Sequence, residues 1–372
     1  MGSNKQIIFY APLGTNTPHN KIGGAEAGCL KTKEIYETAG INVVVIEKPA
    51  MSQGLCHYIL RMMLVPVILF IKAKKAGAKT PIHIVGFYTK VAGFERLLMN
   101  IAHFCGNKVV YELRNGSMIQ TYKEGTKKYR NILKDLVTKP ELVLCQGKEY
   151  VDFIRNEWGV ERSYYPNCIM DSFVKPNNLD RPHPIRLIYF GRVTESKNIN
   201  TVIETLAIIR KANIDAILDI IGGYDDEYKT QLDAVTDKMD VKSYVTFYGR
   251  KDFSFIAERL RLSHYFIFPS QEKQEGHSNS LTEAMGCGVV PVVSPAGFNV
   301  SVCGNEYLVV HSMNAKDYAA KIIEIERKGE WKELSSKAFE HVTKNYTQSV
   351  VGKNLIKEIE LLFNEKQTRF QN

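Results

Sequence analysis

Two glutamates, Glu275 and Glu283, enclose a seven-residue polar segment that begins with Gly276. A strand-like apolar run, 265–270, precedes this segment, and a second apolar run, 289–294, follows it. This order predicts a strand, a loop, a helix and a further strand, with the loop at the carboxyl edge of a parallel sheet. Backbone N–H groups at a helix start favour an anion such as a diphosphate. Glu283 can then accept hydrogen bonds from ribose hydroxyls, and Glu275 can face a sugar.

The residues between the two glutamates can add further ligand contacts. After Gly276 they begin with His277, Ser278, Asn279 and Ser280. Their backbone amides can contact phosphate and sugar hydroxyls, while the side chains of Asn279 and Ser280 can also cap the helix. We favour Ser278 and Asn279 over His277 as contacts. The competing interpretation of the whole segment is a loop with two solvated glutamates.

A second cluster of chemistry-bearing residues follows the predicted strand 185–190. Gly191 and Arg192 come directly after this strand, and Lys197 stands five residues beyond Arg192, where a helix is expected to start. Glycine lets the backbone approach a ligand closely. Arginine offers a planar fork to phosphate oxygens, and lysine a compact charge. The pattern therefore indicates a diphosphate site, with two ordinary surface charges as the alternative.

Together these two segments resemble the Glu-X7-Glu signature and the G-R-x4-K element of retaining glycosyltransferases of family 4, which have the GT-B fold. The resemblance implies that Arg192 and Lys197 bind the diphosphate of a nucleotide sugar, and that Glu275 acts beside them in catalysis. Charge stabilisation of the leaving group should then be the largest catalytic contribution.

The same resemblance implies a role for four further glycines. A Gly-Gly loop, here Gly23-Gly24, approaches the donor phosphate and the acceptor in the family. Gly222 and Gly249 match segments that frame the nucleotide base, where backbone contacts dominate. We therefore expect all four glycines to belong to the donor-binding site.

The chain departs from the family at Arg114, which follows the predicted strand 108–113. Many family members have a histidine there, near the reaction centre. Arginine cannot act as a base at neutral pH, but its charge can stabilise the leaving phosphate or hold an anionic acceptor. With arginine in place of histidine, front-face displacement with retention is still possible, because the leaving phosphate oxygen can itself take the acceptor proton. We expect Glu112, on the same strand, to be structural.

Length and patterning predict two α/β domains. A chain of 372 residues exceeds the size at which one core usually stops growing, and strand and helix patterns alternate throughout. Three prolines within 176–184 exclude a continuing helix or central strand. With the resemblance, this predicts two Rossmann-like domains with parallel sheets that face each other across a cleft. The expected parts are an acceptor-binding domain over 1–176, a linker over 177–184, a donor-binding domain over 185–353, and a final helix, 354–372, that packs back on the first domain.

The periodic patterns also predict individual elements. In the first half the strands are 6–11, 42–47, 82–87, 108–113 and 141–145, with helices at 24–38, 91–105, 122–137 and 148–157. In the second half the strands are 185–190, 216–221, 244–248, 265–269, 289–294 and 307–310, and helices over 315–363 close the chain.

The net charge of +9 is unevenly distributed. Residues 1–185 carry 25 Lys and Arg against 15 Asp and Glu, and residues 186–372 carry 24 against 25. This asymmetry suggests that the first half meets something anionic, either a membrane face or a nucleic acid, unless the lysines are merely solvated. The apolar segment 59–71 is followed by four lysines and is too short to span a bilayer. It either lies in a membrane interface or packs on the N-terminal sheet.

No cofactor or metal is expected. The seven cysteines are scattered and never spaced as CxxC, which favours a reducing compartment over disulfides or a zinc site. Asp225-Asp226 has no third ligand close in sequence, and the resemblance implies that Arg, Lys and a helix dipole replace a metal. The N-terminus shows no apolar signal region, so we expect a cytoplasmic protein, peripheral at the inner face of the plasma membrane.

The expected activity is transfer of a hexosyl unit from a UDP- or GDP-sugar to a lipid-linked saccharide, with retention. The resemblance and the basic, apolar features of the first half place this reaction in the assembly of a bacterial surface polysaccharide such as O-antigen or capsule. Three alternatives remain open: a soluble sugar or small-molecule acceptor, a GT-B epimerase, and a basic nucleic-acid-binding protein. The sequence shows no interleaved aromatic and basic residues of the kind that bind nucleic acid, so we expect no nucleic-acid partner.

Overall fold

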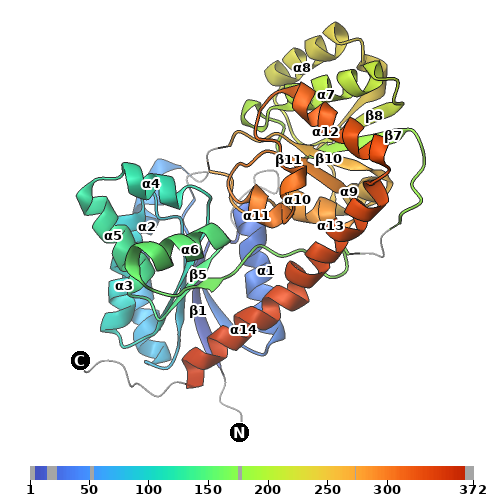
Figure 1. The fold of residues 1–372 in the computed structure, drawn as a ribbon. Coiled ribbons are helices and arrows are strands. Elements are labelled where there is room, and N and C mark those ends of the chain that lie inside the picture. Colours follow the sequence, from blue (N-terminus) through green and yellow to red (C-terminus); the bar gives the residue numbers. More distant parts are fainter. Residues whose placement is uncertain (1–4, 15–22, 51–53, 175–177, 273, 365–372) are drawn as a thin grey trace. The chain divides into compact units, whose positions relative to one another are not determined.

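The computed structural model describes residues 5–14, 23–50, 54–174, 178–272 and 274–364, and the chain divides into two compact units. Unit 1 comprises Met1–Cys168 and Gln348–Asn372, and unit 2 comprises Ile169–Thr347. Each unit has one parallel sheet with helices packed on it (Figure 1). The predicted fold class, α/β with two Rossmann-like parallel sheets, is confirmed.

Unit 1 contains a six-stranded sheet in the order β2-β1-β3-β4-β5-β6. Its strands are β1 (Gln6–Ala11), β2 (Asn42–Glu47), β3 (Ile82–Gly86), β4 (Val109–Leu113), β5 (Leu142–Cys145) and β6 (Ser163–Tyr164). Its helices are α1 (Gly24–Thr38), α2 (Leu55–Ala76), α3 (Ala92–Phe104), α4 (Met118–Glu124), α5 (Lys127–Thr138), α6 (Lys148–Trp158) and α14 (Gln348–Asn364). Strands β3, β4 and β5 are buried along their whole length, which explains their nearly continuous apolar sequences.

The last helix, α14, packs in unit 1 beside α1 (Figure 1). Its buried residues Val351, Leu355 and Ile359 share a core with residues of α1 and the sheet. Gly352 brings the helix close, since a Cβ atom there would lie 3.3 Å from Ile35. The helix begins at Gln348, ahead of the expected 354, and the last part of the expected range, 365–372, lies outside the described residues.

Unit 2 contains a five-stranded parallel sheet in the order β11-β10-β7-β8-β9. Its strands are β7 (Ile185–Phe190), β8 (Ala216–Ile221), β9 (Val245–Gly249), β10 (Tyr265–Phe268) and β11 (Val290–Val293). Its α-helices are α7 (Ile199–Lys211), α8 (Asp226–Lys238), α9 (Phe253–Leu262), α10 (Asn279–Gly286), α11 (Asn299–Cys303), α12 (Ala315–Lys328) and α13 (Trp331–Asn345). The chain leaves β7 toward β8 on one side and later returns to β10 on the other. Ligands of open α/β sheets bind at the carboxyl ends of strands where the order switches in this way.

The unit boundary lies between Cys168 and Ile169, ahead of the proline-rich run. Ile169 forms a bridge with Thr347, and the ring of Phe173 lies 4.4 Å from that of Phe253. Arg181, inside the expected linker, donates a hydrogen bond of 2.6 Å to the carbonyl of Cys287. The described part of the linker therefore packs on unit 2, whereas residue 177 lies outside the described residues.

Two predicted elements are wrong. In place of a strand over 307–310 there is a short 3-10 helix, η5 (Glu306–Leu308), followed by an isolated bridge between Val293 and Val309. The helix expected over 122–137 is split into α4 and α5 at Gly125, where the Thr126 hydroxyl accepts a hydrogen bond from the amide of Tyr129 and starts a new helix.

The apolar segment 59–71 belongs to a longer helix than expected. Helix α2 has 22 residues, and within the described part of the chain it is long and apolar enough to cross a membrane by length and composition. The expectation that the segment is too short to span therefore fails. Only Val65, Leu69 and Ala73 are buried, so packing on the sheet is limited to one stripe of the helix.

Candidate active site

Three of the predicted glycines meet at the carboxyl edge of the unit 2 sheet. The amide of Gly191 donates to the carbonyl of Ile221 (3.0 Å), and the amide of Gly222 donates to the carbonyl of Gly249 (2.9 Å). A Cβ atom at Gly222 would lie 1.7 Å from the carbonyl oxygen of Gly191, so only glycine permits this approach. The loops after β7, β8 and β9 are thereby held as one backbone platform.

Arg192 lies on this platform with an exposed side chain. This side chain is 73% exposed, and its guanidinium stands 3.7 Å from the carboxylate of Glu272. Glu272 also accepts a hydrogen bond from the hydroxyl of Ser196 (3.1 Å), which ties the loop after β7 to the loop after β10. Because an exposed ion pair of this length contributes little, an anionic ligand can recruit the arginine at small cost.

Lys197 is buried and paired with Glu275. It ends the 3-10 turn η3 (Glu195–Lys197), and its Nζ atom bonds the Glu275 carboxylate. The same atom lies 3.4 Å from the Ser270 hydroxyl and 5.3 Å from the centre of the Phe268 ring. Ser270 in turn donates to Glu275 (2.7 Å). The structure thus brings the predicted phosphate-binding lysine and the predicted sugar-facing glutamate into one cluster.

Sequence reasoning missed several residues that hold this cluster. Ser270 follows β10, and its carbonyl accepts a hydrogen bond from the hydroxyl of Ser294 (2.7 Å), which follows β11. Gly297 has a φ of +56°, and a Cβ atom there would lie 1.8 Å from the carbonyl oxygen of Glu275. For Ser270 and Ser294, the position just after a predicted parallel strand was the available signal.

Helix α10 begins beside Glu275, and its N-cap is Ser278. The Ser278 hydroxyl accepts a hydrogen bond from the amide of Leu281 (3.3 Å), so the prediction of capping by Asn279 or Ser280 is wrong. Asn279 is instead the first helical residue, because the extended backbone required of a cap occurs at Ser278. The Ser280 hydroxyl lies 3.0 Å from that of Ser278.

His277 and Glu283 differ in how accessible they are. The His277 ring is buried, with Nε2 2.7 Å from the Thr282 hydroxyl and the ring edge against Tyr346. A ligand contact by His277 would therefore use its backbone. Glu283 is half-buried in α10, next to the buried residues Thr282 and Ala284. Gly276 is also half-buried, between the cluster and this helix.

Arg114 lies in the interior of unit 1, not at an exposed strand end. Its side chain is 3% exposed, with Nη2 2.6 Å from Glu112 and Nη1 donating to Asn167 (3.1 Å). Gly28 makes room for it, since a Cβ atom there would lie 2.2 Å from Nη1. The guanidinium is paired inside the unit, and its predicted contact with a leaving phosphate or an anionic acceptor stays a prediction.

The carboxylate of Glu112 has two cationic or polar neighbours. Burial alone would raise its pKa, but Arg114 and the His83 ring, whose Nε2 lies 3.1 Å from Glu112 Oε2, lower the pKa below the ordinary range. The same ion pair raises the pKa of Arg114 against the opposing effect of burial. Glu112 is thus the structural residue that the strand pattern predicts.

Gly23 and Gly24 begin α1 and are exposed. The Gly23 amide donates to the Glu26 carboxylate (3.0 Å), which closes the first turn of the helix. The structure therefore gives Gly23 a capping role in unit 1, and the predicted role of both glycines in donor binding stays a prediction.

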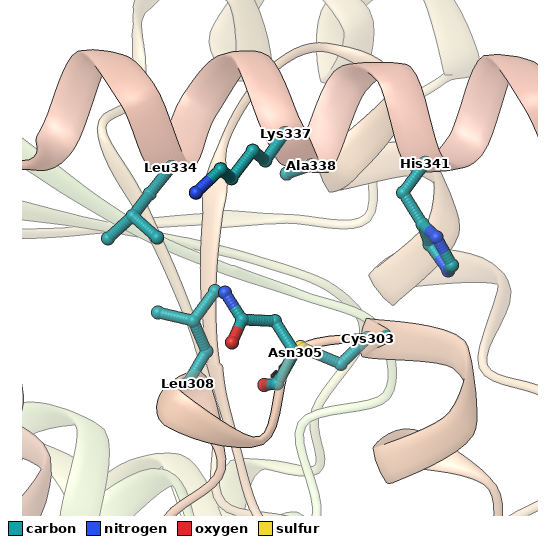
Figure 2. A pocket seen from close by; sticks show the side chains of 8 residues that line it. Cys303, Asn305, Leu308, Leu334, Lys337, Ala338 and His341 are labelled. Atoms are coloured by element: carbon teal, nitrogen blue, oxygen red, sulfur yellow. Dashed lines mark hydrogen bonds between the residues drawn. The ribbon is translucent and has the colours of Figure 1, made fainter.

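Two other features lie apart from the predicted residues. Figure 2 shows a pocket of unit 2 between α13, which contributes Leu334, Lys337 and His341, and the segment with Cys303, Asn305 and Leu308. The acidic pair at 225–226 starts α8, where Asp225 accepts a hydrogen bond from the amide of Tyr228 (2.7 Å). Among the residues the structure describes, no group of three His, Cys, Asp or Glu side chains is arranged to hold a metal ion.

The fold of the chain is that of GT-B glycosyltransferases. It matches sucrose-phosphate synthase from Thermosynechococcus elongatus with a TM-score of 0.74 and 16% identity, over 96% of this chain and 99% of that one. A glycosyltransferase from Rickettsia africae matches with a TM-score of 0.74 and 14% identity, over 97% and 100%. HepE from Anabaena, in complex with UDP, matches with a TM-score of 0.70 and 12% identity, over 96% and 100%. At these identities the likeness shows the fold alone.

In sequence, residues 172–345 match the family model of the glycosyl transferases group 1. The match covers nearly all of unit 2 and slightly less than half of the chain. It includes the platform glycines, Arg192, the Lys197–Glu275 cluster and α10. No curated protein matches the chain in sequence.

Proposed function

We propose that the protein is a retaining glycosyltransferase of family 4 that transfers a hexosyl unit from a UDP- or GDP-sugar. The observation that carries the proposal is the cluster of Lys197, Glu275 and Ser270 beside the exposed Arg192, at the switch point of a sheet within the group 1 family match. The structure of HepE with UDP, which shares the fold, supports a nucleotide diphosphate as the leaving group.

In the proposed mechanism, the diphosphate lies on the glycine platform at the start of α10. Arg192 turns its exposed fork to the phosphate oxygens, and Lys197 shares its charge between the diphosphate and Glu275. The amides at the start of α10 add a favourable dipole. Lys197 and these amides are fixed before the reaction, so they stabilise the charge that develops on the leaving group. We propose that they do so without a metal or other cofactor.

Glu275 accepts hydrogen bonds from the hexosyl hydroxyls through Oε1, since Lys197 and Ser270 both contact its Oε2. The anomeric carbon loses its bond to the diphosphate oxygen and gains a bond to the acceptor oxygen on the same face. The acceptor proton passes to the departing phosphate oxygen, so no protein base is required. Arg114 is paired with Glu112 in unit 1, and in this scheme it keeps the role predicted from the sequence: its charge stabilises the leaving phosphate or holds an anionic acceptor.

For the acceptor, we propose a lipid-linked saccharide of bacterial surface polysaccharide assembly, met at the cytoplasmic face of the plasma membrane. The exposed apolar helix α2 and the excess of 25 basic over 15 acidic residues in 1–185 support this part. If free sugars accept the hexosyl unit as efficiently as a lipid-linked saccharide does, the soluble-acceptor alternative is favoured.

Replacing Glu283 with alanine should weaken binding of the nucleotide. Loss of a charged hydrogen-bond acceptor for the ribose costs about 1.5–3 kcal/mol, which corresponds to roughly a tenfold to hundredfold higher Kd. Isothermal titration with UDP and GDP measures the change. Glu204→Ala, which removes a half-buried glutamate from α7 of the same unit, is the matched control. An unchanged Kd for the Glu283 variant would remove this residue from the site.

A further inference from the structure

Helix α2 exposes an apolar face that none of the described residues of unit 1 covers. We call this face, together with one residue of α3, the apolar patch: Leu60, Met63, Val67, Phe70, Ile71 and Phe104. Each of these side chains is at least 40% exposed, and Phe104 is 76% exposed. Isolated exposed apolar residues are common on soluble proteins, but a contiguous helical face of them marks an interaction site.

The patterning of α2 differs from that expected for a surface helix, whose outward face is normally polar. The inward stripe, Val65, Leu69 and Ala73, repeats every four residues and is buried. It holds the helix on α3, β1 and β2. The outward face is apolar as well, so the helix needs a second apolar environment on that side.

The patch joins two helices and has a basic edge. The rings of Phe70 on α2 and Phe104 on α3 stack with centroids 6.5 Å apart. The Lys74 ammonium lies 5.5 Å from the Phe104 ring and 6.0 Å from the Phe70 ring, at the border of the patch. Lys72, Lys75 and Lys79 follow on the same end, and α2 contains no acidic residue. An anionic surface complements this edge.

We propose that the apolar patch inserts into the interface of an anionic phospholipid bilayer, with α2 lying in the membrane plane and its terminal lysines on the lipid headgroups. Such a helix buries its apolar face at the boundary of headgroups and acyl chains. The inference deepens the acceptor side of the proposed function, because it brings unit 1 to the surface on which a lipid-linked saccharide resides.

The helix lies on the membrane and does not cross it, despite its 22 residues. Crossing would require all its faces to meet lipid, and the stripe of Val65, Leu69 and Ala73 would have to leave the sheet. A second copy of the chain is a poorer occupant of the patch than anionic lipid, because each copy brings the same lysines and the same basic half.

Sedimentation with vesicles tests this surface. We expect the wild-type chain to bind phosphatidylcholine vesicles that contain phosphatidylglycerol, and to bind pure phosphatidylcholine vesicles far less. Met63→Glu with Val67→Glu should lower the partition coefficient by roughly tenfold or more, since two charges would enter the apolar layer. Lys74→Ala and Lys75→Ala should each lower it about fivefold, with a loss of salt dependence.

Leu361→Glu is the matched control, because Leu361 of α14 is an exposed leucine outside the patch (53% exposed) and should leave binding unchanged. Equal binding by wild type and the Met63/Val67 variant, or no binding of wild type to anionic vesicles, would overturn the inference. Light scattering gives one more outcome that would overturn the inference. In that outcome the wild-type chain is an oligomer, the Met63/Val67 variant is a monomer, and neither binds vesicles.

Thermal unfolding with UDP and GDP separates this inference from the proposed function. The patch variants should keep the stabilisation by nucleotide, which also shows that they are folded. If vesicle binding behaves as expected but no nucleotide stabilises the chain, the donor proposal fails and the membrane surface stands.

Discussion

Lys197→Ala should lower the turnover number by about a hundredfold or more while the protein remains folded. Lys197 is a preorganised cation in the proposed donor site, and loss of one such donor to a developing negative charge typically costs roughly 3 kcal/mol of the barrier. The replacement also leaves the Glu275 carboxylate, 12% exposed, without its cationic partner. Steady-state kinetics with the active UDP- or GDP-sugar measures the loss.

Two further variants separate the effect of Lys197 on the leaving group's charge from its effect on the thermal stability of the fold. Combining Lys197→Ala with Glu275→Gln removes the orphaned carboxylate, so thermal stability should recover in part while turnover stays low. Lys229→Ala, which removes the lysine that pairs with Asp233 on α8 of the same unit, should retain normal turnover. Wild-type turnover in Lys197→Ala would contradict the assignment of this residue to the reaction.

Glu112→Ala should destabilise unit 1 by about 3–5 kcal/mol, because it leaves the buried Arg114 cation unpaired. Urea unfolding followed by tryptophan fluorescence measures this. The chain has two tryptophans, Trp158 in unit 1 and Trp331 in unit 2, so a Trp331→Phe background reports on unit 1. Because the two units can unfold separately, such a local probe is required.

The same residue gives a pH dependence with a defined sign. The pKa of Glu112 is lowered in the folded chain, so its contribution is present above the ordinary carboxyl pKa of 4.5 and is lost as the pH falls through the lower folded value. The unfolding free energy should therefore decline more steeply below pH 4.5 in the parent than in Glu112→Gln. Glu161→Ala, which removes an exposed partner of Arg155, should change little. Equal stability of Glu112→Ala and its parent would refute the buried pair.

Much of unit 2 could be predicted because its strands are mostly apolar and glycine or polar residues follow them closely. The strand at 185–190, the glycine after it and the spacing to Lys197 are local features of the sequence. The pairing of Lys197 with Glu275 is different, since it depends on β7 and β10 being neighbours in the sheet. Local spacing contains no information on that adjacency.

Other residues show where local patterns are insufficient. Glu112 and Arg114 stand two residues apart, and side chains at this spacing lie on the same face of an extended strand. Their pairing could therefore be predicted from the sequence. The burial of that pair was not, because it depends on Gly28 and Asn167 from distant segments. For α2, hydropathy indicated an apolar helix, but which of its faces the sheet covers is decided by packing.

A thermal-shift measurement on the purified chain with UDP, GDP, ADP and their sugar conjugates, with and without EDTA, tests the central claim most directly. A ligand at roughly a hundred times its Kd adds about 2.7 kcal/mol of stability. We predict stabilisation by UDP or GDP and the matching sugar conjugate, unchanged by EDTA and reduced in Arg192→Ala and Lys197→Ala. Absence of stabilisation by every diphosphate, with the chain folded, would contradict a nucleotide-sugar site in unit 2.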